Sequence, residues 1–145
     1  MKAILQRVQS GSVSVSGNKI AEIEAGLVIL LGVGPADTET EADKLALKLA
    51  QMRIFPDKNG KMNLSLMDVN GQALVVPQFT LFADTRKGHR PSFFKAATPE
   101  IAKPLTDYFA AALDKLGILT QQGEFGAHML VEIHNDGPVT IEVEI

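Results

Sequence analysis

Asn135-Asp136-Gly137-Pro138-Val139-Thr140 lies between two stretches of alternating apolar residues near the end of the chain, residues 129–133 and 139–145. Alternation with a period of two is typical of half-buried strands, so the sequence predicts a hairpin whose turn contains residues 135–138. Glycine reaches backbone angles closed to other residues, and proline lowers the cost of a cis peptide bond to roughly 0.5–1 kcal/mol over trans. The Gly137-Pro138 pair is therefore either a plain turn, which the neighbouring Asn and Asp favour, or a rigid segment that presents two carbonyl groups in a fixed direction.

The composition is that of an ordinary globular protein. The 145 residues are 46% hydrophobic and 21% charged, which predicts one domain, residues 1–145, with a sizeable core. A formal net charge of −3 means that any contact with RNA must come from a local basic patch. The absence of cysteine excludes disulfides, thiolate metal sites and a cysteine nucleophile. No signal sequence or membrane-spanning run is recognisable, so we expect a cytoplasmic protein that does not contact a membrane.

Strand patterns outnumber helix patterns along the chain. Residues 27–31 are continuously apolar and predict a central strand covered on both faces. Other segments that alternate, or that are apolar and bounded by turn residues, are residues 2–8, 12–16, 19–24, 61–67 and 73–76. Pro77 marks the end, the edge or a bulge of the last of these strands, because proline cannot donate to a sheet.

Two helices follow strands in the sequence. Thr38 and Glu41 form a capping-box pattern before an apolar stripe at residues 42–52. A second amphipathic helix begins at Thr98-Pro99 and ends at Gly117, with Pro104 predicting a kink or a later start. The sequence therefore predicts a single-domain α/β fold with mixed or antiparallel stacked sheets, barrel-like, and two main helices packed on one face.

Few side chains offer catalytic chemistry. No serine elbow, phosphate-binding loop or zinc motif is present, and the acidic residues alternate as on solvent-exposed strand faces, so we expect no metal and no cofactor. Thr80 is the one hydroxyl between a buried strand and a basic loop. It is a nucleophile, a residue that orients substrate or water, or an ordinary strand threonine. The basic loop, residues 83–95, is either solvated or the contact surface for one end of a nucleic acid.

Three segments together resemble one family. Residues 74–81 (Leu-Val-Val-Pro-Gln-Phe-Thr-Leu), residues 88–93 (Gly-His-Arg-Pro-Ser-Phe) and residues 135–140 resemble, in order and spacing, the D-aminoacyl-tRNA deacylases, also called D-tyrosyl-tRNA deacylases. Residues 6–8 and 53–63 are similar as well, so the likeness runs from end to end. The resemblance implies a homodimeric enzyme that hydrolyses the ester between a D-amino acid and tRNA. It also implies activity on glycyl-tRNA, because glycine is achiral.

The resemblance further implies roles for individual residues. The Gly137-Pro138 bond would be cis and would enter the active site of the partner subunit, where its two carbonyl groups reject the side chain of an L-amino acid. Gln78, Phe79 and Thr80 would form the catalytic segment of that site. The remaining assignments are substrate binding by Pro77, Met129 and Asn135, support of the Gly-Pro segment by Arg7, and tRNA contact by Arg86, Lys87 and Arg90.

The reaction implied by the resemblance needs no metal or cofactor. Water attacks the ester carbonyl with help from the 2′-hydroxyl of the terminal ribose, and backbone amides near Phe79 and Thr80 stabilise the oxyanion. The chain departs from the commoner family motif at Pro77, where serine is usual, so a mechanism that needs this hydroxyl is excluded. A related class that removes L-alanine from tRNA has proline there, but usually alanine where this chain has Phe79.

We therefore expect a D-specific deacylase. One alternative is additional activity on L-alanyl-tRNA. Two alternatives from other classes are a non-catalytic RNA- or protein-binding module and a hydrolase of small esters with Thr80 as nucleophile.

Overall fold

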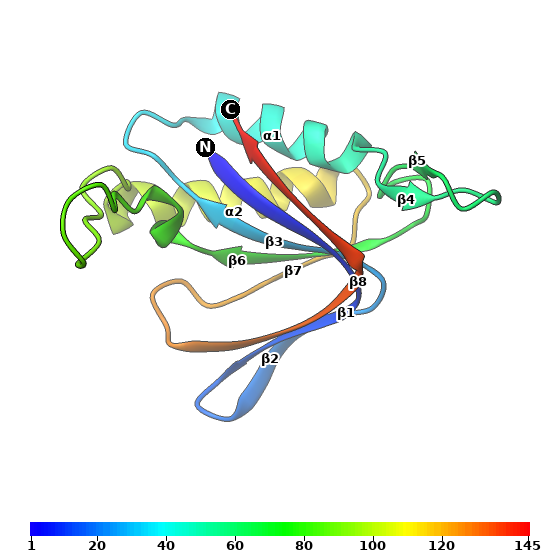
Figure 1. Cartoon of the computed structure of the whole chain (residues 1–145), viewed down its shortest axis with the longest axis horizontal. Helices are drawn as coiled ribbons and strands as arrows, with labels where there is room; N and C mark the ends of the chain where they lie inside the picture. The colour runs from blue at the N-terminus through cyan, green and yellow to red at the C-terminus, as the bar shows by residue number, and fades with distance from the viewer.

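A computed structural model describes residues 1–145, and its longest strands form one curved six-stranded sheet (Figure 1). The strand order is β2-β1-β3-β6-β7, and β8 pairs with β1. The strands of this sheet are β1 (Lys2–Val15), β2 (Asn18–Ile23), β3 (Gly26–Gly32), β6 (Gln72–Pro77), β7 (Thr120–Gln122) and β8 (Met129–Glu144). β6 is parallel to both β3 and β7, and the other pairs are antiparallel. β4 (Phe55–Pro56) and β5 (Met62–Leu64) form a small separate hairpin.

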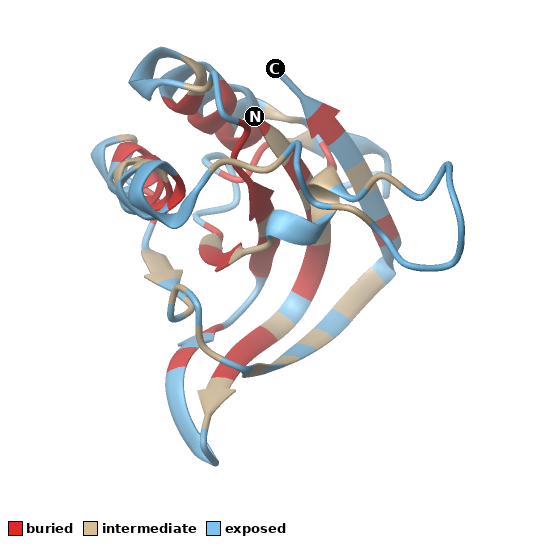
Figure 2. Ribbon diagram, turned by 90° about the vertical axis from the view of Figure 1, so that its left-hand side faces the viewer, coloured by how far each residue is buried: buried red, intermediate tan, exposed pale blue.

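Two helices, α1 (Glu39–Gln51) and α2 (Pro99–Lys115), cover one face of this sheet (Figure 1). The capping box of α1 is confirmed, because the Glu41 carboxylate accepts from the Thr38 amide at 3.0 Å and the Thr38 hydroxyl accepts from the amide of Thr40. Figure 2 shows the buried residues gathered where the helices face the strands; there Leu45 and Phe109 pack in the main core without solvent exposure. The predicted barrel-like α/β architecture with two helices is confirmed.

The later start that Pro104 predicted for α2 is wrong. The helix begins at Pro99, as Thr98-Pro99 indicated, and continues through Pro104 to Lys115. Pro104 lies on the exposed side of α2, where water can bind the backbone carbonyl group that lacks a donor.

The hairpin predicted at residues 135–138 is also wrong. β8 is one strand, and both of its arms pair with β1: Thr140 lies opposite Gln6, and Asn135 lies opposite Val8. Between these two pairs, the single residue Arg7 of β1 faces residues 136–139 of β8, so these four residues form a bulge. Alternating residues flank a Gly-Pro pair both in a hairpin and in a single bulged strand. The two structures differ only in the strand with which each arm pairs. Likewise, residues 2–8 and 12–15 belong to one strand, β1, not two, and Ser16 lies in the turn that follows it.

Two further segments differ from expectation. Only Met62–Leu64 of the strand predicted at residues 61–67 is extended and paired. After Pro77 the chain leaves the sheet and forms the short 3-10 helix η1 (Phe79–Phe82), so Thr80 is not a strand residue. Pro77 ends β6 because it has no amide hydrogen for the next ladder bond. Neither helix is long and apolar enough to cross a membrane.

Candidate active site

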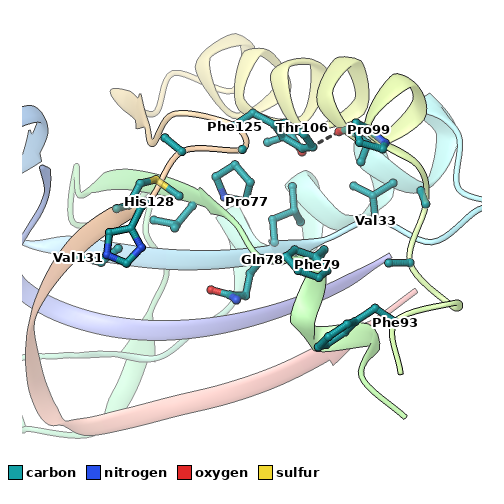
Figure 3. Close-up of a pocket in the computed structure, with 18 residues that line it drawn as sticks. Val33, Pro77, Gln78, Phe79, Phe93, Pro99, Thr106, Phe125, His128 and Val131 are labelled. Atoms are coloured by element: carbon teal, nitrogen blue, oxygen red, sulfur yellow. Dashed lines mark hydrogen bonds between the residues drawn. The ribbon is translucent and has the colours of Figure 1, made fainter. Parts of the chain in front are cut away.

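A mostly apolar pocket of about 560 Å³ opens beside the ends of β3 and β6, under the first turns of α2 (Figure 3). Its walls come from β3 and β6, from the turn leading into η1, from α2 and from the segment that leads into β8. The lining residues are Leu31, Val33, Val76, Pro77, Gln78, Phe79, Phe93, Ala96, Ala97, Pro99, Ala102, Thr106, Phe125, Gly126, Ala127, His128, Met129 and Val131. Such a concave apolar surface with few polar groups suits a small organic group.

The segment Pro77-Gln78-Phe79 forms one rim of this pocket. The Gln78 amide donates to the Leu31 carbonyl at 2.7 Å, which holds the start of η1 against the end of β3. The Phe79 ring is 56% exposed and meets Phe93 edge to face, with ring centroids 5.0 Å apart. Of the predicted catalytic segment, Gln78 and Phe79 thus line the pocket, together with Pro77.

Thr80 lies next to the pocket but does not line it. Its hydroxyl accepts a hydrogen bond from the Gln78 side-chain amide, and the residue is exposed. No basic side chain contacts this hydroxyl that could remove its proton. The geometry therefore lacks the base that an activated hydroxyl nucleophile requires.

Two polar lining residues were not selected from the sequence. The Thr106 hydroxyl donates to the Ala102 carbonyl at 2.8 Å, one turn earlier in α2, so its proton is already used within the helix. His128 immediately precedes β8 and is the single ionisable side chain of the pocket wall (Figure 3). No local sequence signal distinguishes His128, because α2 and the approach to β8 meet only in the folded chain.

The bulge of β8 forms a second group of the predicted residues, anchored by Arg7. Arg7 is only 8% exposed; its Nε donates to the Asp136 carbonyl at 3.2 Å, and its Nη1 donates to the Ile54 carbonyl at 2.6 Å. The same Nε lies 3.2 Å from a carboxylate oxygen of Asp136. The Gly137-Pro138 peptide bond is cis and Gly137 has a φ of 126°, where an added Cβ would lie 3.0 Å from Arg7 Nη2.

The Asn135 side chain forms hydrogen bonds across the bulge. Its Oδ1 accepts from the Val139 amide at 3.1 Å, and its Nδ2 donates to the Thr140 hydroxyl at 3.4 Å. Gly137 and Pro138 are exposed, and neither lines the pocket of its own chain. The predicted site residues therefore fall into two separate groups in one chain: Met129 joins the rim residues at the pocket, whereas Asn135 and Arg7 join the bulge.

The basic side chains of the loop differ in whether an acidic side chain pairs with them. Arg86 donates from Nε to a carboxylate oxygen of Asp84 at 2.8 Å and pairs with it again through Nη2, so its charge is largely matched. These hydrogen bonds from Arg86 hold the pKa of Asp84 well below its usual range. Lys87 and Arg90 are exposed and form no ion pair, which leaves them available to a phosphate group.

Comparison with known proteins identifies the class to which this architecture belongs. A solved structure titled a probable eukaryotic D-amino acid tRNA deacylase is similar in fold, with a TM-score of 0.86 at 17% identity over 99% of this chain and 98% of that one. The structure of c-Myc DNA Unwinding Element Binding Protein is similar with a TM-score of 0.94 at 41% identity, covering 100% of this chain and 99% of the other.

The family model described as D-Tyr-tRNA(Tyr) deacylase matches residues 4–144, and the chain belongs to this family of hydrolases. Relatives named D-aminoacyl-tRNA deacylase include one from Roseiflexus castenholzii, 58% identical over 97% of this chain and 90% of the relative. Another, from Desulfatibacillum aliphaticivorans, is 54% identical over 99% of both chains. The resemblance drawn from residues 74–81, 88–93 and 135–140 is thereby confirmed.

Proposed function

We propose that the chain hydrolyses the ester bond of D-aminoacyl-tRNA and releases the free D-amino acid and tRNA. The supporting observation is the division of the candidate residues into an apolar pocket and a separate bulge whose Gly137 and Pro138 are exposed. Neither group alone contains both a substrate-binding cavity and a rigid stereochemical barrier. The activity is that for which the relatives are named, and a cytoplasmic location, with access to aminoacylated tRNA, belongs to the same proposal.

The two groups are brought together in a homodimer. The Gly137-Pro138 segment of one subunit enters the pocket of the other, and its carbonyl groups occupy the space that the side chain of an L-amino acid would need. The anchoring of the bulge by Arg7 and Asn135 supports this arrangement, because exclusion of one enantiomer requires a barrier that does not yield. Glycyl-tRNA passes the same barrier, since glycine has no side chain on either side.

The chemistry relies on the substrate and on the backbone. Water attacks the ester carbonyl, assisted by the 2′-hydroxyl of the terminal ribose; the carbonyl–oxygen bond to the ribose then breaks, and the 3′-oxygen leaves with a proton. The amides of Phe79 and Thr80 stabilise the oxyanion, and Gln78 and Thr80 position the substrate. The lack of a base beside the Thr80 hydroxyl supports this route over a threonine nucleophile.

Pro77 supports a second candidate activity, removal of L-alanine from tRNA. Pro77 lines the pocket, so the serine hydroxyl of the commoner family motif is absent from its wall. The neighbouring Phe79 favours the D-specific activity, so D-aminoacyl-tRNA remains the main proposed substrate.

The test is hydrolysis of D-tyrosyl-tRNA, L-tyrosyl-tRNA, glycyl-tRNA and L-alanyl-tRNA by the purified protein, together with sedimentation. We expect release of D-tyrosine and glycine, no release of L-tyrosine, and a dimer in solution. Equal rates on the two tyrosyl-tRNAs would refute the stereochemical barrier, and a fully active monomer would refute the cross-subunit site.

A further inference from the structure

We propose that the β4–β5 hairpin of one subunit binds the phosphate backbone of the tRNA whose aminoacyl end occupies the pocket of the partner subunit. This inference rests on the cross-subunit arrangement proposed above. It assigns the exposed lysines Lys58 and Lys61, in the loop between β4 and β5, to tRNA binding in trans.

The hairpin is joined directly to the bulge. One guanidinium group, that of Arg7, donates to the Ile54 carbonyl at 2.6 Å and to the Asp136 carbonyl at 3.2 Å. Ile54 immediately precedes β4, and Asp136 immediately precedes the Gly137-Pro138 pair. Arg7 and Ile54 are 8% and 5% exposed, so this connection is shielded from water. Wherever the bulge is placed in a dimer, the base of the hairpin accompanies it.

The hairpin holds its own shape. The Asp57 carboxylate accepts from the amides of Asn59 and Lys61 at 2.8 and 3.1 Å and from the Asn63 side chain at 3.2 Å. Arg53 Nε donates to the Asn63 carbonyl at 2.8 Å, which braces the opposite side. The conformation of the loop is thus fixed by hydrogen bonds among residues 53–63 of the same chain.

The ammonium groups of the two lysines are not held by any acidic side chain. Both are exposed and neither forms an ion pair. The nearest acid in sequence, Asp57, is held by hydrogen bonds within the loop and keeps its negative charge, so Asp57, Lys58 and Lys61 together give the loop a net charge of +1. On a chain with a net charge of −3, unmatched cations that project beside a substrate-facing segment fit a polyanion.

In one chain, the hairpin and the basic loop lie at opposite ends of the molecule. Figure 1 shows β4 and β5 at the end of the molecule where β1 and β8 bend, and the loop of residues 83–95 at the opposite end. When the bulge of one subunit enters the partner's pocket, the hairpin of the first subunit and the Lys87–Arg90 region of the second flank the same site. A tRNA bound there is held by cations from both subunits.

The first experiment compares the double variant Lys58→Ala/Lys61→Ala with the unaltered protein on two substrates, D-tyrosyl-tRNA and D-tyrosyl-adenosine. We expect kcat/KM on the tRNA to fall about tenfold and its salt dependence to lose about two units of slope, because two phosphate contacts are removed. D-tyrosyl-adenosine has no phosphate, so its kcat/KM should be unchanged. The control variant Lys19→Ala/Lys115→Ala removes the same charge elsewhere and should behave as the unaltered protein.

Unchanged kcat/KM on the tRNA would overturn the inference, as would an equal fall on both substrates, which would indicate damage to the pocket. Failure of the unaltered protein to act on either substrate would instead refute the proposed function itself.

The second experiment uses mixed dimers to test the arrangement in trans. Ala96→Trp fills the pocket of the subunit that carries it, and Ala96 is a partly exposed lining residue. In one dimer the blocked pocket and the lysine substitutions lie in different subunits, so the open pocket faces an intact hairpin and should show the unaltered KM. In the other dimer both changes lie in one subunit, so the open pocket of its partner faces a substituted hairpin and KM should rise about tenfold. The reverse pattern would mean that the hairpin serves its own pocket.

Discussion

Replacement of Arg7 by alanine tests whether the bulge is held as rigidly as stereochemical exclusion requires. The side chain makes two hydrogen bonds to backbone carbonyl groups, of Ile54 and Asp136, from a charged donor. Each such bond contributes about 1.5–3 kcal/mol. The Ile54 carbonyl lies in a residue that is 5% exposed, so water replaces the lost donor poorly. We expect Arg7→Ala to lower the free energy of unfolding by about 3 kcal/mol, or roughly 10 °C in Tm for a chain of this length.

The assay combines urea unfolding at one fixed protein concentration with kcat/KM on D- and L-tyrosyl-tRNA. The pocket residues are not altered, so we expect activity on the D-substrate to persist while the L-substrate becomes accepted. Arg7→Lys should be intermediate, because a single ammonium group cannot bridge both carbonyl groups as the planar guanidinium does.

Phe109→Leu serves as the matched control, since Phe109 is fully buried in the main core on α2 and forms no hydrogen bond to the bulge. It should destabilise the fold and leave the preference for the D-enantiomer intact. The reasoning is refuted if Arg7→Ala costs less than about 1 kcal/mol. It is also refuted if Phe109→Leu relaxes the stereochemical preference to the same extent.

Three other predictions concern the bulge, the hairpin and the pocket rim. Gly137→Ala should destabilise the protein by about 2 kcal/mol and admit L-substrates, because φ is 126° and the new Cβ would lie 3.0 Å from Arg7 Nη2; unaltered unfolding and selectivity would contradict it. Hydrogen bonds from the amides of Asn59 and Lys61 lower the pKa of Asp57 below its unfolded value. Its contribution is therefore complete above the unfolded pKa and lost as pH falls through the folded pKa. The stability difference between Asp57→Asn and the unaltered protein, followed by urea unfolding against pH, should be present at neutral pH and vanish in acid. Thr80→Ala should retain measurable single-turnover hydrolysis; complete loss in a folded dimer would indicate a nucleophilic hydroxyl.

Local patterns predicted those parts of the fold that are determined locally. The capping box at Thr38 and Glu41 and the continuous apolar run of β3 appear in the structure as expected. Each depends on residues within a few positions of one another. Burial of the apolar residues in the folded protein favours the same helix and strand as these local signals.

The parts that the sequence did not predict depend on which distant segment is the partner. The alternation around Gly137-Pro138 is the same whether the two arms pair with each other or with β1, and nothing in residues 129–145 records that β1 is long enough to accept both. The pocket shows the same limit. Pro77, Gln78 and Phe79 could be selected from one motif, whereas Thr106 and His128 reach the pocket only through the packing of α2 and the approach to β8.

The pairing of both arms of β8 with one continuous strand bears on how selectivity can diverge among such enzymes. A change of length in a hairpin turn shifts the register of its arms and turns every following side chain to the other face. Here residues 129–135 and 140–144 each pair with β1, which sets the register of the two arms separately. The bulge between them begins and ends at paired residues. The register of the two arms therefore does not depend on the length of residues 136–139, although Asp136 and Gly137 contact Arg7 and Val139 is buried in the main core. If this segment is the proposed stereochemical barrier, its length can change without a register shift in the sheet, and the contacts of Asp136, Gly137 and Val139 limit which residues can replace them.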